Sequence, residues 1–391
     1  MVLEREPTDP EALNSMGALL QLRGRLDEAI GYYRRSLDLD ARSAPPHYNL
    51  AQALRAKGNI SEAIRHYERA IGLTPRDYEA HWGLAIALAR AGRQDEAVVH
   101  FEDAISLNAA NPALVTDFSV FLNDRGVALA DKGRPDEASA AFDRALQIRP
   151  HFPEALVNRG VRLAATGQFD RAIASYSEAL ALKPDFAQGL AVLANALYKK
   201  GERDEAMANY RRALATQPDN LSALVGLGAA LTELGELEQA EFTLRRALAL
   251  RPDDPDALIN LGGLLYKRGA FHEAAASFRK ALSARPSDPD AYYNLGLAMY
   301  RTGDRDAAIA SYQRALALKP DYRLALMNLG VALEDKGELE DAIAVYQKVV
   351  TLRPAQALGH YYLGLALARA GRHAQARKAL AEALRLDPGL K

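Results

Sequence analysis

The sequence contains no cysteine, which excludes disulfides, thiolate catalysis and cysteine-based zinc sites. Its formal net charge is only −1, so a general affinity for nucleic acid has no electrostatic basis. No apolar run approaches the roughly 18 residues of a membrane span, and the N-terminal stretch MVLEREPTDP has no apolar signal region. We therefore expect a cytoplasmic protein with no membrane insertion and no nucleic-acid partner.

Catalytic motifs are missing as well. The sequence has no P-loop, no G-x-S-x-G motif and no dinucleotide-binding fingerprint. Its eight histidines show no H-x-x-x-H or H-E-x-x-H spacing, and its acidic residues do not single out a catalytic pair. The expectation is a chain that is not an enzyme by itself and that has no catalytic residues, no metal site and no cofactor.

What the sequence has instead is one motif that recurs eleven times with a period of 34 residues. Each copy has a glycine, an alanine five residues after it, and a small residue seven residues before it. The period is broken once, by seven extra residues between the third and fourth copies. The glycines are Gly24, Gly58, Gly92, Gly133, Gly167, Gly201, Gly235, Gly269, Gly303, Gly337 and Gly371.

Each copy is predicted to form two helices, which in the ninth copy span residues 290–302 and 305–318. Gly303 fits a left-handed position that ends the first helix, and Asp306 is a plausible N-cap of the second. Gly296 and Ala308 lack bulk where the two helices must approach closely. One such pair cannot bury its apolar stripe alone, so neighbouring copies must stack. The corresponding N-cap candidates in other copies are Asp27, Ser61, Asp95, Asp136, Asp170 and Asp204.

The 34-residue period, the small residue at position 8, Gly at 15, Ala at 20 and 27, an aromatic residue near 24 and Pro at 32 resemble the tetratricopeptide repeat (TPR) family. The resemblance covers essentially all of residues 2–390. It implies an all-α fold, a solenoid of about eleven helix-turn-helix repeats wound as a right-handed superhelix. It also implies a concave groove, lined by the first helix of each repeat, that holds peptides or partner proteins.

Asparagine recurs at position 6, on the side of the first helix opposite the packing positions 4, 7, 8 and 11. An amide offers donors and an acceptor that suit an extended peptide backbone. Alternatively, these amides satisfy neighbouring backbone groups or water. The row resembles the asparagine ladder of O-linked N-acetylglucosamine transferase. It consists of Asn49, Asn158, Asn260, Asn294 and Asn328.

Tyrosine followed by a cation recurs at positions 12 and 13 of the same face. Tyrosine offers a large contact area at little entropic cost, and the cations add charge complementarity. Alternatively, this is a solvated face with tyrosines typical of the family. Tyr293 and the single tryptophan, Trp82, both stand at position 5 and could anchor a ligand or pack along the groove wall. The pairs are Tyr198 with Lys199, Tyr266 with Lys267, and Tyr300 with Arg301.

The seven extra residues, Pro112 to Phe118, divide the chain into repeats 1–3 (residues 1–111) and repeats 4–11 (residues 112–391). They predict one long helix, about residues 112–132, that projects beyond the stack, although the insertion could also be neutral. Position 7, usually Leu, is Arg125 and Arg159 just after the break. These arginines either lay their stems on apolar surface with their heads in water or form an anion or partner site.

Both ends of the chain look cut. Residues 1–9 match the tail of a preceding repeat, and no extra helix covers the last apolar face. The ends could therefore meet other copies end to end or continue into a fused domain. The first function hypothesis is a non-catalytic scaffold that holds a protein or an extended peptide in its groove. The alternative is the substrate-selecting array of a larger, bacterial glycosyltransferase-type enzyme.

Overall fold

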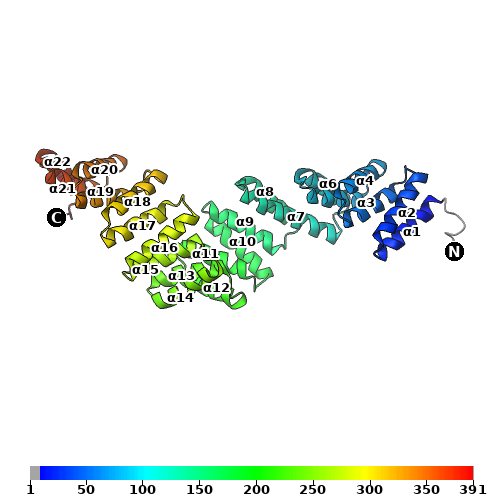
Figure 1. Ribbon diagram of the computed structural model, residues 1–391, viewed down its shortest axis with the longest axis horizontal. Helices are drawn as coiled ribbons and strands as arrows, with labels where there is room; N and C mark the ends of the chain where they lie inside the picture. Colours follow the sequence, from blue (N-terminus) through cyan, green and yellow to red (C-terminus); the bar gives the residue numbers. More distant parts are fainter. Residues whose placement is uncertain (1–8, 391) are drawn as a thin grey trace. The chain divides into compact units, whose positions relative to one another are not determined.

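The computed structural model describes residues 9–390, which form 22 α-helices and no β-strand (Figure 1). Consecutive helices pair into eleven hairpins, one for each repeat, as the period predicts. Residues 1–8, which include most of the predicted tail of a preceding repeat, lie outside the described part. Within that part, no helix is both long and apolar enough to cross a membrane.

The chain divides into two compact units, residues 1–182 and residues 183–391. The predicted division at residues 111 and 112 stays a prediction. The first unit holds repeats 1–5, whose helices are α1 (Pro10–Leu22), α2 (Leu26–Leu39), α3 (Ala44–Ala56), α4 (Ile60–Leu73), α5 (Tyr78–Arg90), α6 (Gln94–Leu107), α7 (Pro112–Asp131), α8 (Pro135–Ile148), α9 (Pro153–Ala165) and α10 (Phe169–Leu182). The second unit holds repeats 6–11, whose helices are α11 (Ala187–Lys200), α12 (Arg203–Thr216), α13 (Leu221–Leu234), α14 (Leu237–Leu250), α15 (Pro255–Lys267), α16 (Phe271–Ala284), α17 (Pro289–Thr302), α18 (Arg305–Leu318), α19 (Arg323–Lys336), α20 (Leu339–Leu352), α21 (Ala357–Arg369) and α22 (His373–Leu386).

The turn inside each hairpin is made by the recurring glycine. All eleven of these glycines have φ between 71° and 89°, the left-handed region that other residues avoid, so the predicted role of Gly303 is confirmed. The predicted N-cap of the following helix is wrong by two residues. Helix α18 begins at Arg305, and its cap is Asp304, which accepts a hydrogen bond from the Ala307 amide at 3.0 Å.

The predicted N-caps of the other repeats are wrong for the same reason. The glycine turn is so short that the second helix begins two residues after the glycine, which places the predicted caps inside the first helical turn. A carboxylate there faces the positive end of the helix dipole and stabilises the helix in that way instead of by capping. The carboxylates concerned are Asp27, Asp95, Asp136, Asp170, Asp204 and Asp306, and the neutral Ser61 lies at the same position of α4.

The two helices of a repeat meet at the small residue of position 8. In repeat 9, Gly296 on α17 lies against the ring of Tyr312 on α18, which is only 1% exposed. A Cβ added to Gly296 would stand 2.5 Å from Cε1 of Tyr312, closer than two carbon atoms can approach. Ala308 is fully buried beside it. The predicted close approach at these two residues is therefore confirmed.

This contact predicts opposite effects for two glycine-to-alanine changes. Gly296→Ala should lower the free energy of unfolding by about 1–3 kcal/mol, because the buried tyrosine ring must move. Gly263→Ala on α15 should raise it by about 0.5–1 kcal/mol, because a Cβ there meets nothing within 4 Å and alanine favours the helix. Urea unfolding of both variants checks the prediction, and equal shifts of the same sign would contradict it.

The longest helix is α7, which has 20 residues and begins at the Pro112 that opens the insertion. The expectation that its extra turns project beyond the stack is wrong. Leu114 and Phe118, both within the insertion, are fully buried. The ring of Phe118 stacks on Phe101 of α6 with centroids 4.8 Å apart and planes inclined by 6°. The inserted turns are thus a packing surface for the repeat that precedes them.

The two halves of α7 follow the frames of two different repeats. Its N-terminal half continues the frame of repeat 3, where Trp82 donates to Asp117, 35 residues later. Its C-terminal half starts the frame of repeat 4, where Asn123 accepts from Asn158, again 35 residues later. Seven residues make almost two turns of an α-helix. One face of α7 therefore serves both registers, displaced by about 10 Å along the axis.

Candidate functional site

The first helices of repeats 6–10 lie next to one another in the second unit, so the predicted concave positions form one continuous face. Helix α11 contacts α13, α13 contacts α15, α15 contacts α17, and α17 contacts α19. Side chains at positions 5, 6, 12 and 13 meet across these pairs. The structure shows which of them are bonded to a neighbouring repeat and which are not.

Three of the five position-6 asparagines bond to the preceding repeat. The amide of Asn328 donates to the hydroxyl of Tyr293 at 3.0 Å, which places both residues in one inter-repeat contact. In the first unit, Asn49 donates to Asn14 at 3.0 Å and Asn158 donates to Asn123 at 2.8 Å. Each bond runs from position 6 to position 5 of the repeat before. These three amides thus bond to side chains of the preceding repeat and tie the repeats together, instead of bonding to backbone groups or water.

The other two position-6 asparagines are not tied in this way. Within the described residues, no hydrogen bond is formed by the side chain of Asn260 or Asn294, and both are half-buried. The residues at position 5 of the preceding repeats are Val225 and Ile259, which have no polar group to offer. The two amides therefore keep their full hydrogen-bonding capacity on adjacent first helices.

The tyrosine and cation pairs form a second set of inter-repeat contacts, from position 12 to position 13. The Tyr300 hydroxyl donates to Asp335 at 2.5 Å, and this hydrogen bond raises the pKa of the tyrosine. Lys267 donates to the Thr232 carbonyl at 2.8 Å. Neither group is free to recruit a ligand without breaking a contact inside the array.

The remaining aromatic candidates also pack within the array. The Arg301 guanidinium lies 4.3 Å from the ring centroid of Phe271 and 5.9 Å from that of Tyr266. The ring of Tyr293 lies 5.2 Å from that of Tyr322, and burial raises its pKa. These rings and the Arg301 guanidinium pack against side chains of neighbouring helices on the face of the predicted concave positions.

One cavity opens on this face, across α11, α13 and α15. Its volume of about 540 Å³ falls within the usual range of ligand pockets. Asn260 and Lys199 both reach it, and the exposed Lys199 forms no ion pair with a described residue. Of the predicted residues, the structure thus brings Tyr198, Lys199 and Asn260 together here. The lining residues from the first helices are Asn195, Tyr198, Lys199, Leu221, Ser222, Val225, Gly226, Ala229, Asp256 and Asn260.

The sequence-based selection missed Asn195, Ser222 and Asp256, which also line this cavity. They stand at positions 9 and 2, which belong to the concave set by helical spacing. Asn195 and Ser222 were missed because neither residue recurs at its position in the other repeats, as asparagine does at position 6. Asn195 is bonded on both sides, to Ser222 at 3.2 Å and to the Tyr210 hydroxyl at 2.6 Å.

In the first unit, Trp82 is half-buried and its indole nitrogen donates to Asp117 at 3.1 Å. The two arginines at position 7 are also paired, each with an exposed carboxylate of the array. Arg125 forms an ion pair with Asp95. Arg159 donates to Ser175 at 3.2 Å and lies 3.7 Å from a carboxylate oxygen of Glu178.

Family models described as tetratricopeptide repeats match residues 9–76, 48–112, 123–185, 163–208, 197–261, 293–357 and 357–390, and one described as a TPR repeat matches residues 264–303. Together they cover the hairpins of both units. The chain belongs to the tetratricopeptide repeat family. The longer of the two gaps between these matches, residues 113–122, falls within α7, where the TPR frame restarts.

Two solved structures with TM-scores above 0.5 share the fold, and a third is similar over about half of the chain. The APC/C hetero-tetramer Cut9–Hcn1 is 14% identical over 97% of this chain and 94% of that chain, with a TM-score of 0.55. IFIT1 with Gppp-AAAA is 18% identical over 88% and 90%, with a TM-score of 0.51. YrrB, titled a TPR protein with an unusual peptide-binding site, is 27% identical over 48% and 97%, with a TM-score of 0.37. No curated protein matches the sequence.

Proposed function

We propose that this TPR array is a non-catalytic scaffold that binds an extended segment of a partner protein on the concave face of repeats 6–9. TPR arrays are typically protein-binding scaffolds, which supports this assignment at the level of the family. The observation that carries it for this chain is the pair of unbonded amides, Asn260 and Asn294, on adjacent first helices. Asn328, Tyr300 and Lys267, by contrast, are engaged in contacts between repeats.

The spacing of these amides suits a peptide main chain. Adjacent packed helices are about 8–10 Å apart, and an extended chain advances about 3.3 Å per residue. Asn260 and Asn294 can therefore hold peptide groups about three residues apart, whatever the side chains between them. The unpaired Lys199 at the same cavity adds a preference for a ligand with an acidic side chain towards repeat 6.

Selection of a phage-displayed random peptide library on the immobilised chain tests this function. The selected peptides should bind the wild-type chain and lose binding to Ala229→Arg, whose long side chain fills the cavity at α13. Ala208→Arg is the matched control, because Ala208 is exposed on the second helix α12 and does not line the cavity. Peptides that bind all three chains equally well by fluorescence anisotropy would place the binding surface elsewhere.

A further inference from the structure

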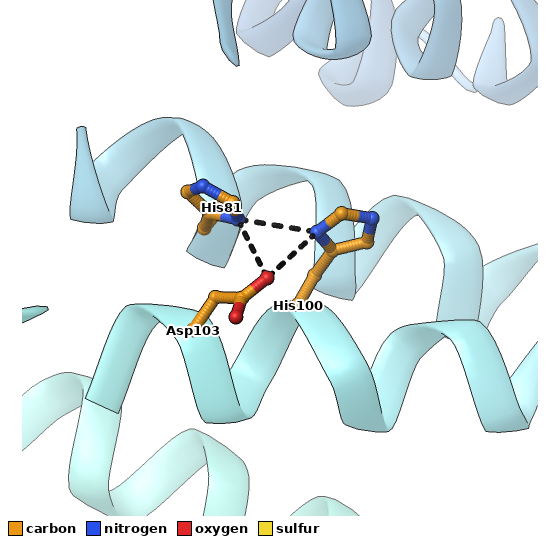
Figure 2. Close-up of side chains that lie close together, drawn as sticks. All are labelled: His81, His100 and Asp103. Atoms are coloured by element: carbon orange, nitrogen blue, oxygen red, sulfur yellow. Dashed lines mark hydrogen bonds and ion pairs between the residues drawn. The ribbon is translucent and has the colours of Figure 1, made fainter. Parts of the chain in front are cut away.

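Two histidines and a carboxylate converge between the helices of repeat 3. His81 comes from α5, and His100 and Asp103 come from α6, with their ring nitrogens and carboxylate oxygen pointing at one another (Figure 2). The two Nδ1 atoms are 3.1 Å apart, and a carboxylate oxygen of Asp103 lies 3.4 Å from the first and 3.7 Å from the second. We propose that His81, His100 and Asp103 bind a zinc ion.

The geometry of the three ligand atoms fits a tetrahedral metal. Nitrogen and oxygen ligands lie about 2.0–2.1 Å from zinc, so two ligands of a tetrahedral site are about 3.3–3.4 Å apart. The three separations here bracket that value. Asp103 is half exposed, which leaves an open side for water as the fourth ligand. Two imidazoles and one carboxylate also form a donor set that zinc prefers.

A backbone contact already orients His81 for this role. Its Nε2 lies 3.2 Å from the Pro75 carbonyl, which can only accept, so Nε2 carries the proton and Nδ1 presents its lone pair to the site. A carbonyl that holds the outer nitrogen in this way is the usual support of a metal-binding histidine.

Repeat 2 offers an internal comparison. His47 and His66 occupy the same positions 34 residues earlier, with their Nδ1 atoms 2.9 Å apart and Nε2 of His47 at 3.3 Å from the Ala41 carbonyl. The position of Asp103 is taken there by Arg69. The histidine pair of repeat 2 therefore has a cation where the pair of repeat 3 has its third ligand. The carboxylate distinguishes a candidate metal site from two histidines that share a hydrogen bond.

Sequence spacing alone could not find this site. His81 and His100 are 19 residues apart on two helices, and they meet only because the hairpin of repeat 3 folds them together. The residues are also unusual for their positions. Position 4 is leucine in seven repeats, and position 26 is Arg69 or Arg144 in the flanking repeats. Leucine and arginine are therefore substitutions that the fold already accepts.

Zinc titration of the full chain by calorimetry tests the proposal. The wild-type chain should bind one zinc ion, and His81→Leu and Asp103→Arg should each weaken binding by more than about 100-fold, since even an outer-sphere partner accounts for about 10–100-fold. Cobalt should give the intense visible bands of a tetrahedral site in the wild type and in His66→Ser, but not in His81→Leu or Asp103→Arg. His66→Ser is the control and should bind zinc as the wild type does.

A gain of binding gives an independent test. Arg69→Asp copies the third ligand into repeat 2 and should raise the stoichiometry from one zinc to two. Thermal melts without metal should show that every variant is folded, and added zinc should raise the melting temperature of the wild type but not of Asp103→Arg. Equal zinc binding by the wild type, His81→Leu and Asp103→Arg would overturn the proposal, as would loss of binding in His66→Ser.

Discussion

Deletion of residues 112–118 is expected to lower the stability of the first unit by about 2–4 kcal/mol, although it restores a uniform 34-residue period. The deletion shifts the remaining residues of α7, 119–131, by about two helical turns along the surface of repeat 3. Asp124 then takes the place of Asp117 beside Trp82, so the indole nitrogen keeps a carboxylate acceptor. Arg125, however, replaces the fully buried Phe118 against Phe101.

The displaced arginine would have no acceptor in its new surroundings. Repeat 5 tolerates Arg159 at the same position because Ser175 and Glu178 receive its guanidinium group. The corresponding residues of repeat 4 are Ala141 and Arg144, one apolar and one of like charge. In the wild-type chain Arg125 pairs with Asp95. After the deletion Asp95 would lie opposite a different turn of α7, so this ion pair would be lost.

The matched control is the same deletion combined with Arg125→Leu, which returns the ordinary leucine to position 7. Urea unfolding and hydrogen exchange of α5–α7 should show the loss of stability in the deletion variant. Most of that stability should return in the deletion variant that also carries Arg125→Leu. A deletion variant as stable as the wild type would mean that the two registers of α7 have no energetic role.

Replacement of both Asn260 and Asn294 by alanine is expected to weaken peptide binding by about 5-fold to 150-fold. Each lost hydrogen bond to the ligand costs about 0.5–1.5 kcal/mol, and a tenfold change in affinity corresponds to about 1.4 kcal/mol. The melting temperature should change little, because neither amide bonds to another described side chain or backbone group.

Asn328→Ala is the matched control for this pair. It removes the same side chain from the same position, but there the amide donates to Tyr293 of the preceding repeat. We expect it to lower the stability of the second unit by about 1 kcal/mol with a smaller effect on affinity. Thermal melts would contradict this distinction if Asn328→Ala and the double variant of Asn260 and Asn294 lowered the melting temperature equally.

The helical repeats could be predicted because their signal is local and is repeated. Gly303 and its equivalents mark the turn in every copy, and Asn111 followed by Pro112 marks the start of α7. The position of the N-caps could not be read in the same way, because the length of the glycine turn decides whether Asp304 or Asp306 caps α18.

The state of each candidate site residue depends on a neighbour in the preceding repeat. Asn328 and Asn294 share one position, yet one is bonded because Tyr293 precedes it and the other is free because Ile259 does. The pairing of positions 5 and 6 follows from the stacking register, which the period alone does not provide. The alternative function, a substrate-selecting array of a glycosyltransferase-type enzyme, stays a prediction.

The central claim is that the free amides on the concave face of repeats 6–9 hold the ligand, and calorimetric titration of one selected peptide tests it most directly. The peptide is titrated into the wild-type chain and into the variant with Asn260→Ala and Asn294→Ala. We predict a dissociation constant at least about fivefold higher for the variant, with the melting temperature unchanged. Equal dissociation constants for the two chains would contradict the account.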